Sequence, residues 1–176
     1  MPRWRMTAET PPLPAIRRLC AEDIEIFRAI RREALTETPA AFASTAEDFA
    51  RLSDTALSDT LGNLAVFAAL RDGEPVGLMG LARQVPSKMA HRGTVIMVYL
   101  RAAERGGQLA KRLLAAVENE ARALGLRQLE LAVTVENAAA LAFYRREGFR
   151  QIGQIPGGFL HEGRAIDEIL MMRPVA

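Results

Sequence analysis

Two short stretches of the sequence combine residue types and spacings that suit ligand binding. The first runs from Arg105 to Lys111, where Gly106 and Gly107 stand between an apolar, strand-like run and a helical pattern. A helix that begins after such a turn offers backbone N–H groups without intrahelical partners, and its dipole favours negative charge there. We therefore interpret this stretch as a phosphate-binding turn. A plain connecting turn is the alternative, because short glycine patterns are weakly specific.

The second stretch runs from Val135 to Phe149 and contains Asn137 and Tyr144. These two residues are seven positions apart, about two helical turns, so they fall on one face of the expected helix. Asn137 is a preferred helix-capping residue, and its amide also suits binding of an amide-containing ligand. The alternative is a capped amphipathic helix whose aromatic residues pack in the core.

Composition and charge exclude several classes of protein. The 176 residues are 49% apolar and 25% charged, which is typical of one globular domain with a substantial core. The net charge is only +2, with basic and acidic residues interleaved, so we expect no nucleic-acid partner. The single cysteine, Cys20, gives neither a disulfide nor a metal-binding spacing; we expect no metal and a cytoplasmic location. No apolar run approaches the ~20 residues that span a bilayer, so no membrane association is expected.

The periodicity of the chain predicts a flexible tail over residues 1–14, with four prolines, and one domain over 15–176. We expect an α+β fold with a single mixed, mostly antiparallel sheet of about seven strands flanked by four helices. Asp72-Gly73 between two apolar runs predicts a hairpin, and residues 156–164 are expected to form a glycine-rich loop. The expected strands cover 15–19, 64–70, 75–82, 94–100, 129–135, 150–155 and 165–172, and the expected helices cover 21–35, 44–61, 107–124 and 137–147.

Together the two stretches resemble the GNAT family of N-acetyltransferases, and the resemblance extends from about Ile16 to Arg173. The first lies on the family's acetyl-CoA pattern, [QR]-x-x-G-x-[GA], and the second matches N-x-x-A-x-x-[FL]-Y-x-x-x-G-F at every specified position. Two residues depart from the family pattern. Gln108 stands where the family has a glycine that lets the backbone approach a pyrophosphate, and Ala102 stands where the family has a proline.

The resemblance implies that the central strands separate and that acetyl-CoA binds in the gap. Asn137 would then bind the pantetheine arm, and Tyr144 would protonate the departing CoA thiolate, for which a phenol of ordinary pKa near 10 is suited. A backbone N–H near Leu100 or Arg101 would stabilise the developing oxyanion. The cofactor-binding residues that the resemblance implies are Leu100, Arg101, Arg105, Gly106, Gly107, Gln108, Leu109, Ala110, Lys111 and Asn137.

The resulting hypothesis is an enzyme that moves an acetyl group from acetyl-CoA to a primary amine of a small molecule, a protein N-terminus or a lysine. The general base is left open among Glu130, Tyr99, His91 and a water relay. Phe42 and Phe159 are expected on the acceptor side, and homodimers are common in this fold. The alternative is a non-catalytic CoA-binding or interaction module of the same fold, which the two departures favour.

Overall fold

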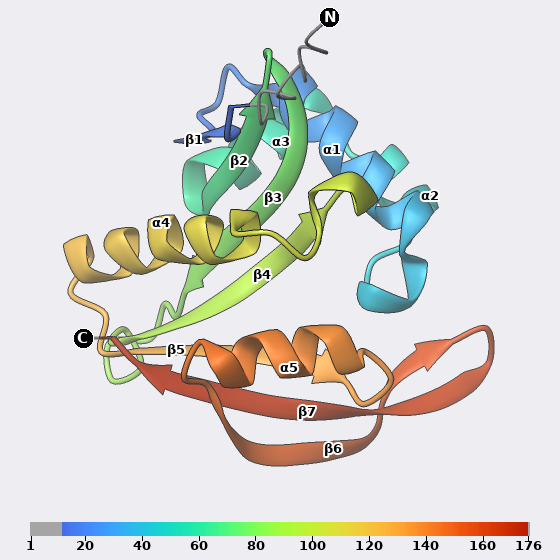
Figure 1. The fold of residues 1–176 in the computed structure, drawn as a ribbon, viewed down its shortest axis with the longest axis vertical. Helices are drawn as coiled ribbons and strands as arrows, with labels where there is room; N and C mark the ends of the chain where they lie inside the picture. Colours follow the sequence, from blue (N-terminus) through green and yellow to red (C-terminus); the bar gives the residue numbers. More distant parts are fainter. Residues whose placement is uncertain (1–11, 176) are drawn as a thin grey trace, which may run out of the picture.

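The computed structural model describes residues 12–175, and in this range the chain forms one seven-stranded sheet and five α-helices (Figure 1). The strand order is β1-β2-β3-β4-β5-β7-β6. The expected α+β fold around a single mixed sheet is therefore confirmed. The strands are β1 Ala15–Arg18, β2 Ala65–Arg71, β3 Glu74–Arg83, β4 Arg92–Leu100, β5 Gln128–Thr134, β6 Arg150–His161 and β7 Arg164–Pro174. The α-helices are α1 Ile24–Glu37, α2 Ala46–Ala50, α3 Asp54–Asn63, α4 Leu109–Ala123 and α5 Ala138–Arg146, with short 3₁₀ turns at Pro39–Ala41 and Ala102–Glu104.

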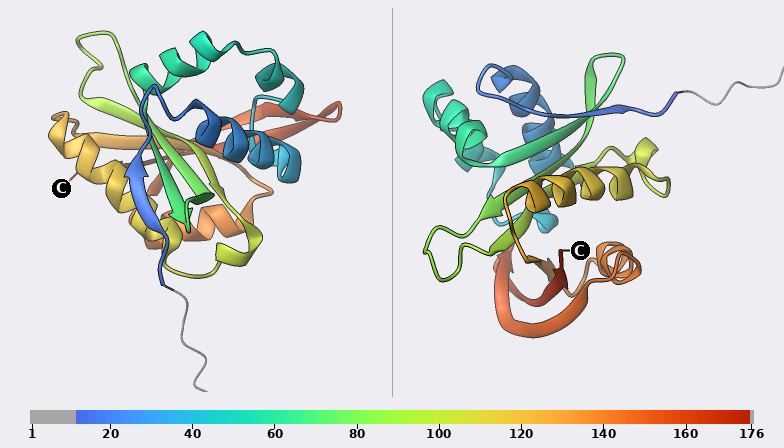
Figure 2. Two further views of the ribbon diagram at one scale, coloured as in Figure 1. Left: turned by 90° about the horizontal axis from the view of Figure 1, so that it is seen from above. Right: turned by 90° about the vertical axis from the view of Figure 1, so that its left-hand side faces the viewer.

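The helices cover both faces of the sheet, so the core is divided into two apolar clusters. Successive side chains of β2 alternate between them, as the period of a strand requires. Phe67 and Ala69 join the cluster under α4 and α5, whereas Val66 and Ala68 join the cluster under α1, α2 and α3. Figure 2 shows α4 on one side of the sheet and α1 with α3 on the other. No helix within residues 12–175 is long and apolar enough to cross a membrane.

The two central strands separate along their length. The parallel pairing of β4 with β5 covers only three residue pairs, from Arg92 with Gln128 to Thr94 with Glu130. Beyond these pairs β4 is bonded only to β3, and β5 only to β7. Figure 1 shows the two ribbons meeting at one end and diverging towards the other. A register shift against β3 and a positive φ of 56° at Met97 mark a bulge in β4, which bends the strand beside the gap.

The expected helix over 44–61 is wrong, because the chain forms α2 and α3 there. Each of these helices has its own N-cap. The Thr45 hydroxyl accepts a hydrogen bond from the Asp48 N–H at 3.0 Å, and the Ser53 hydroxyl accepts one from the Ala56 N–H at 3.2 Å. Capping at Ser53 starts a new helix directly after the first has ended, so the fold has five α-helices and not four.

The expected loop over 156–164 is also wrong. Strand β6 continues to His161, and only Glu162 and Gly163 form the turn to β7. A bulge between Ile155 and Phe159 absorbs the extra glycines. Most of the expected tail, residues 1–11, lies outside the described residues. Residues 12–14 run up to β1, with the Pro12 and Pro14 carbonyls accepting hydrogen bonds from arginine side chains.

Candidate functional site

Two cavities meet in the gap between β4 and β5. We call them the α4 cavity, of about 480 Å³, and the β7 cavity, of about 420 Å³. The α4 cavity is bordered by the end of β4, the turn before α4 and the helix α5. The β7 cavity is bordered by β4, β5, the segment 41–44 after α1, and single residues of α1, β6 and β7. Asn137, Ala140 and Tyr144 line both cavities, so one face of α5, from its N-cap to its last turn, lies at their junction.

The first turn of α4 faces the α4 cavity with free backbone donors. Gln108 is the N-cap residue, but its side chain makes no capping hydrogen bond, and the first turn holds no acidic residue. The first N–H groups of a helix have no intrahelical partners, and no side chain among residues 12–175 replaces them here. Gly106, at a φ of +78°, and Gly107 line the same cavity without side chains to fill it. This arrangement suits an anion, and the phosphate-binding turn stays a prediction.

Apart from Arg101, which is described below, three of the residues expected to bind the cofactor do not line the α4 cavity. Gln108 and Lys111 are exposed, and Leu109 packs in the core beneath α4. The Gln108 side chain therefore does not fill the α4 cavity.

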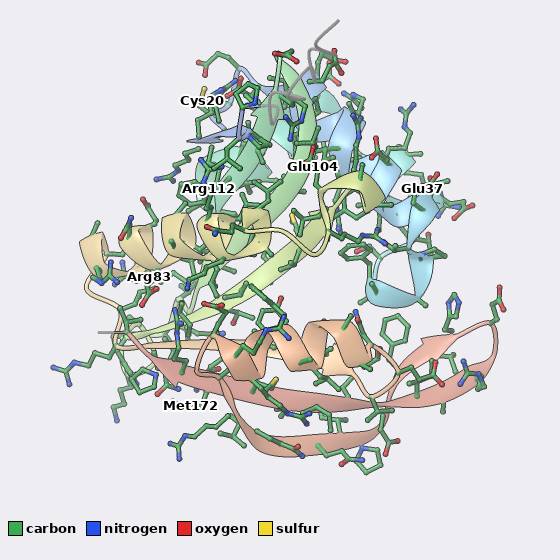
Figure 3. The ribbon with its side chains drawn as sticks, in the orientation of Figure 1. Cys20, Glu37, Arg83, Glu104, Arg112 and Met172 are labelled. Atoms are coloured by element: carbon green, nitrogen blue, oxygen red, sulfur yellow. The ribbon has the colours of Figure 1, made fainter. Side chains whose placement is uncertain are left out.

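The charges around the α4 cavity favour an anionic ligand. Arg105 and Arg146 line it, and Glu104 is the acidic residue among the lining residues that the structure describes. Figure 3 labels Glu104 on the turn ahead of α4. Arg71 donates two hydrogen bonds to the Glu104 carboxylate, at 2.9 and 3.0 Å, and lowers the pKa of that carboxyl group. Because Arg71 neutralises Glu104, the two lining arginines leave the cavity with net positive charge.

The backbone of Leu100 faces the gap. The Arg101 N–H donates to the Val76 carbonyl of β3 at 3.0 Å, and Leu100 lies opposite Gly77. Hydrogen-bonded and non-hydrogen-bonded pairs alternate along antiparallel strands, so Leu100 directs its N–H and C=O away from β3. The Arg105 Nε donates to the Leu100 carbonyl at 2.9 Å. An extended ligand in the gap can thus pair with β4 at Leu100, as the sequence resemblance implied.

Arg101 lies away from both cavities, contrary to the sequence expectation. Its guanidinium donates two hydrogen bonds of 2.8 Å to Glu33 of α1, and its backbone N–H is already bonded to Val76. The residue therefore joins α1 to the end of β4, and its N–H is not available as an oxyanion donor.

We expect Arg101→Gln to lower the free energy of unfolding by about 0.5–1 kcal/mol at pH 7, the usual value for a partly exposed ion pair. Arg101 lowers the pKa of Glu33 below its ordinary 4.5, so the stabilisation is present above that pH and is lost as pH falls through the folded-state pKa. Urea unfolding at several pH values measures this. A difference between variant and wild type that is the same at pH 7 and pH 3 contradicts the assignment.

Tyr144 is buried between the two cavities. Its ring contacts Phe143 and Phe149 at centroid distances of 5.2 and 5.4 Å. Burial raises the pKa of its hydroxyl, so the group stays protonated at neutral pH. Within residues 12–175 the hydroxyl has no hydrogen-bond partner, and it is therefore available to donate a proton to a ligand.

Asn137 performs the capping role that its sequence position predicted. Its Oδ1 accepts a hydrogen bond from the Ala140 N–H at 3.1 Å. The carboxamide nitrogen is left to donate to a ligand at the junction of the cavities. Capping and ligand binding, which the sequence presented as alternatives, are thus compatible in one side chain.

The β7 cavity contains both aromatic residues that we expected on the acceptor side, Phe42 and Phe159. It also contains two charged residues that sequence reasoning did not select, Arg31 and Glu168. Arg31 had a signal in the sequence, since it is a charged residue on the apolar face of α1. Glu168 had no such signal in the sequence, because acidic residues are common on partly exposed strands.

The three residues considered as the general base do not line the β7 cavity. Glu130 accepts a 2.7 Å hydrogen bond from Arg92 at the closed end of the gap. The Tyr99 hydroxyl donates to Glu33 at 3.1 Å. His91 is exposed on the loop before β4. Glu168, in contrast, lines the cavity and has no side-chain partner within the described range.

Comparison with known proteins agrees with this geometry. A model of the Acetyltransferase (GNAT) family matches residues 27–149. The chain belongs to the GNAT family of acetyltransferases. The matched segment begins in α1 and ends just after α5, so it includes the α4 turn and the helix that carries Asn137 and Tyr144.

Individual GNAT relatives match over different lengths. The L-methionine sulfoximine/L-methionine sulfone acetyltransferase of Pseudomonas aeruginosa is 33% identical over 161 residues, which cover 89% of this chain and 92% of the relative. The IAA acetyltransferase of Azospirillum brasilense is 35% identical over 91 residues, which cover 52% of this chain and only 58% of that relative. The yncA structure from Salmonella typhimurium, solved with its cofactor acetyl-CoA, shares the fold with a TM-score of 0.78 at 22% identity, covering 92% of this chain and 94% of that one.

Proposed function

We propose that this GNAT protein transfers an acetyl group from acetyl-CoA to the primary amine of a small molecule. The observation that carries the proposal is the junction of two cavities at Tyr144 and Asn137, one suited to an anionic cofactor and the other of a size for a small acceptor. The Pseudomonas relative is named for an acetyl transfer to amino-acid analogues, which supports a small-molecule acceptor over a protein N-terminus or lysine.

In this proposal the α4 cavity holds acetyl-CoA. The backbone N–H groups of the first α4 turn bind the diphosphate, and Arg105 adds positive charge. The exposed edge of β4 at Leu100 pairs with the pantetheine arm, to which the Asn137 carboxamide nitrogen donates. Acetyl-CoA supplies a thioester, whose acetyl group passes to the amine while the thiol leaves. The proton transfers that accompany this step are carried out by side chains of the protein.

Two side chains then transfer protons, one as a base and one as an acid. The Glu168 carboxylate takes a proton from the acceptor nitrogen in the β7 cavity, directly or through one water. Tyr144 donates its hydroxyl proton to the sulfur that leaves. A neutral amine loses one proton and the departing thiolate gains one, so the transfer is balanced. An acceptor that arrives as an ammonium first gives one further proton to solvent through Glu168.

Calorimetric titration of the full chain with acetyl-CoA tests the proposal. We expect saturable binding and, with an accepted amine, release of free thiol. Asn137→Ser keeps a good helix cap but removes the amide donor, so we expect about 10-fold weaker acetyl-CoA binding with an unchanged melting temperature. No binding at millimolar acetyl-CoA rules out the function, and unchanged affinity in Asn137→Ser rules out the role of that residue.

The alternative hypothesis is a non-catalytic CoA-binding module. In the sequence, Gln108 was one of the two departures that favoured such a module. That argument is weaker because Gln108 lies outside the α4 cavity. Acetyl-CoA binding without thiol release across a broad panel of amines would favour it over the enzyme. A homodimer stays a prediction of the sequence resemblance, which light scattering of the purified chain tests.

A further inference from the structure

Arg31 is a buried cation at the edge of the β7 cavity. It lies on the inner face of α1, between Ile30 and Ala34, and only 7% of its surface is exposed. Its guanidinium stands over the Phe42 ring, 4.6 Å from the centroid. Burial lowers its pKa to about 10, so the group still carries its charge at neutral pH.

This charge is not neutralised within the described part of the chain. The Arg31 Nη1 is buried and has no hydrogen-bond partner, and the residue forms no ion pair. Arg31 also borders a smaller cavity of about 210 Å³ with Asp48. The Asp48 carboxylate is instead engaged in the cap of α2, where it accepts from the Thr45 N–H, and it lies 3.8 Å from Arg51. A buried, unpaired guanidinium is destabilising, so an interaction with a ligand is a reason for its presence.

The other charged residue of the β7 cavity has the opposite sign. Glu168, on β7, lines the cavity with Arg31, and the remaining lining residues are uncharged. A Cβ atom on Gly158 would lie 2.9 Å from Glu168 Oε2, so the glycine at that position leaves room for the carboxylate. The cavity therefore offers one cationic and one anionic group to a small acceptor.

We propose that Arg31 binds an oxyanion group of the acceptor, so that the enzyme selects small amines that also carry a carboxylate or a comparable acid; this rests on the acetyl transfer proposed above. The ligand acid replaces the missing partner of the guanidinium, and the ligand amine faces Glu168. Arg31 is a specificity residue in this scheme and takes no part in proton transfer. A zwitterionic acceptor satisfies both charges, whereas an amine without an acid leaves Arg31 unpaired.

Paired acceptors test this directly. Each α-amino acid is compared with its own α-carboxamide, and 2-aminoethylphosphonate with 2-aminoethanol, by following free thiol release. We expect wild type to favour the acid by about 10- to 100-fold in kcat/KM, the range for a charge-assisted, bidentate contact. A preference within only one kind of pair identifies whether the acid is a carboxylate or a phosphonate.

Three variants separate this role from a structural one. Arg31→Met keeps a long apolar side chain and is expected to abolish the acid preference, chiefly through a higher KM for the acids. Arg31→Lys keeps the charge but lacks the planar guanidinium that can donate two parallel hydrogen bonds to an acid, so it should retain part of the preference. Arg32→Met, on the exposed side of the same helix, should behave as wild type. A structural arginine would lower the melting temperature when removed, whereas we expect Arg31→Met to melt at or above the wild-type temperature.

Each outcome decides a different hypothesis. Equal rates for acid and carboxamide in wild type, or a preference that survives in Arg31→Met, overturn the role of Arg31 while acetyl transfer stands. Absence of acetyl-CoA binding overturns the proposed function itself. If acetyl-CoA binds but no amine is acetylated, the CoA-loaded protein is titrated with the same amino acids by calorimetry. Equal amino-acid affinity in wild type and Arg31→Met then overturns the inference.

Discussion

Tyr144→Phe is expected to lower kcat by about 100-fold or more, the usual loss when a general acid is removed. The acetyl-CoA affinity should hardly change, because the hydroxyl has no partner in the described structure and the ring keeps its contacts with Phe143 and Phe149. The melting temperature should be unchanged for the same reason. Steady-state thiol release, with calorimetry of acetyl-CoA binding, separates the two effects.

The chain provides a matched control, since it contains only two tyrosines. The Tyr99 hydroxyl donates to Glu33 and does not line the β7 cavity, so Tyr99→Phe should retain most of kcat. Equal turnover by wild type and Tyr144→Phe would remove Tyr144 from the acid role. A similar loss in both variants would indicate a general effect on the gap between β4 and β5.

The elements that could be predicted from sequence are those whose determinants are local. Asp72-Gly73 predicted the hairpin between β2 and β3, and both residues adopt the positive φ values, 52° and 86°, that a two-residue turn of this kind requires. Asn137 and Gly148 likewise delimited α5. The division of α2 from α3 was also local, since Ser53 caps a new helix inside the segment, but the apolar spacing through the segment favoured one helix.

The pairing of charges across the fold could not be predicted, because it depends on which strands and helices become neighbours. Arg101 lies next to the predicted turn in sequence, yet Glu33 of α1 binds it. Arg31 and Glu168 come from α1 and β7, near opposite ends of the chain, and share a cavity only because β7 inserts beside β5. The turn and the helix that border the α4 cavity have local sequence signals and could be selected from the sequence. The pair of charges in the β7 cavity has no such local signal, because the fold brings the two residues together.

Glu168→Gln is expected to lower kcat/KM by about 100-fold at neutral pH, because the amide cannot accept the proton that the amine must lose. The loss should shrink as pH rises above the pKa of the acceptor amine, since the amine is then already neutral in solution. The pH profile of kcat/KM for variant and wild type measures this. The affinity for acetyl-CoA should be unchanged, because Glu168 does not line the α4 cavity.

The neighbouring Asp167 supplies the control for this prediction. Its carboxylate accepts hydrogen bonds from the Gln154 side chain and the Gly157 N–H, at 2.6 and 2.8 Å, and it does not line the β7 cavity. Asp167→Asn should therefore keep both the rate and the shape of the pH profile. If Glu168→Gln lowers the rate by one constant factor at every pH, the carboxylate holds the amine in place and does not take its proton. Without Glu168 as the base, a water relay to a more distant group becomes the mechanism to test.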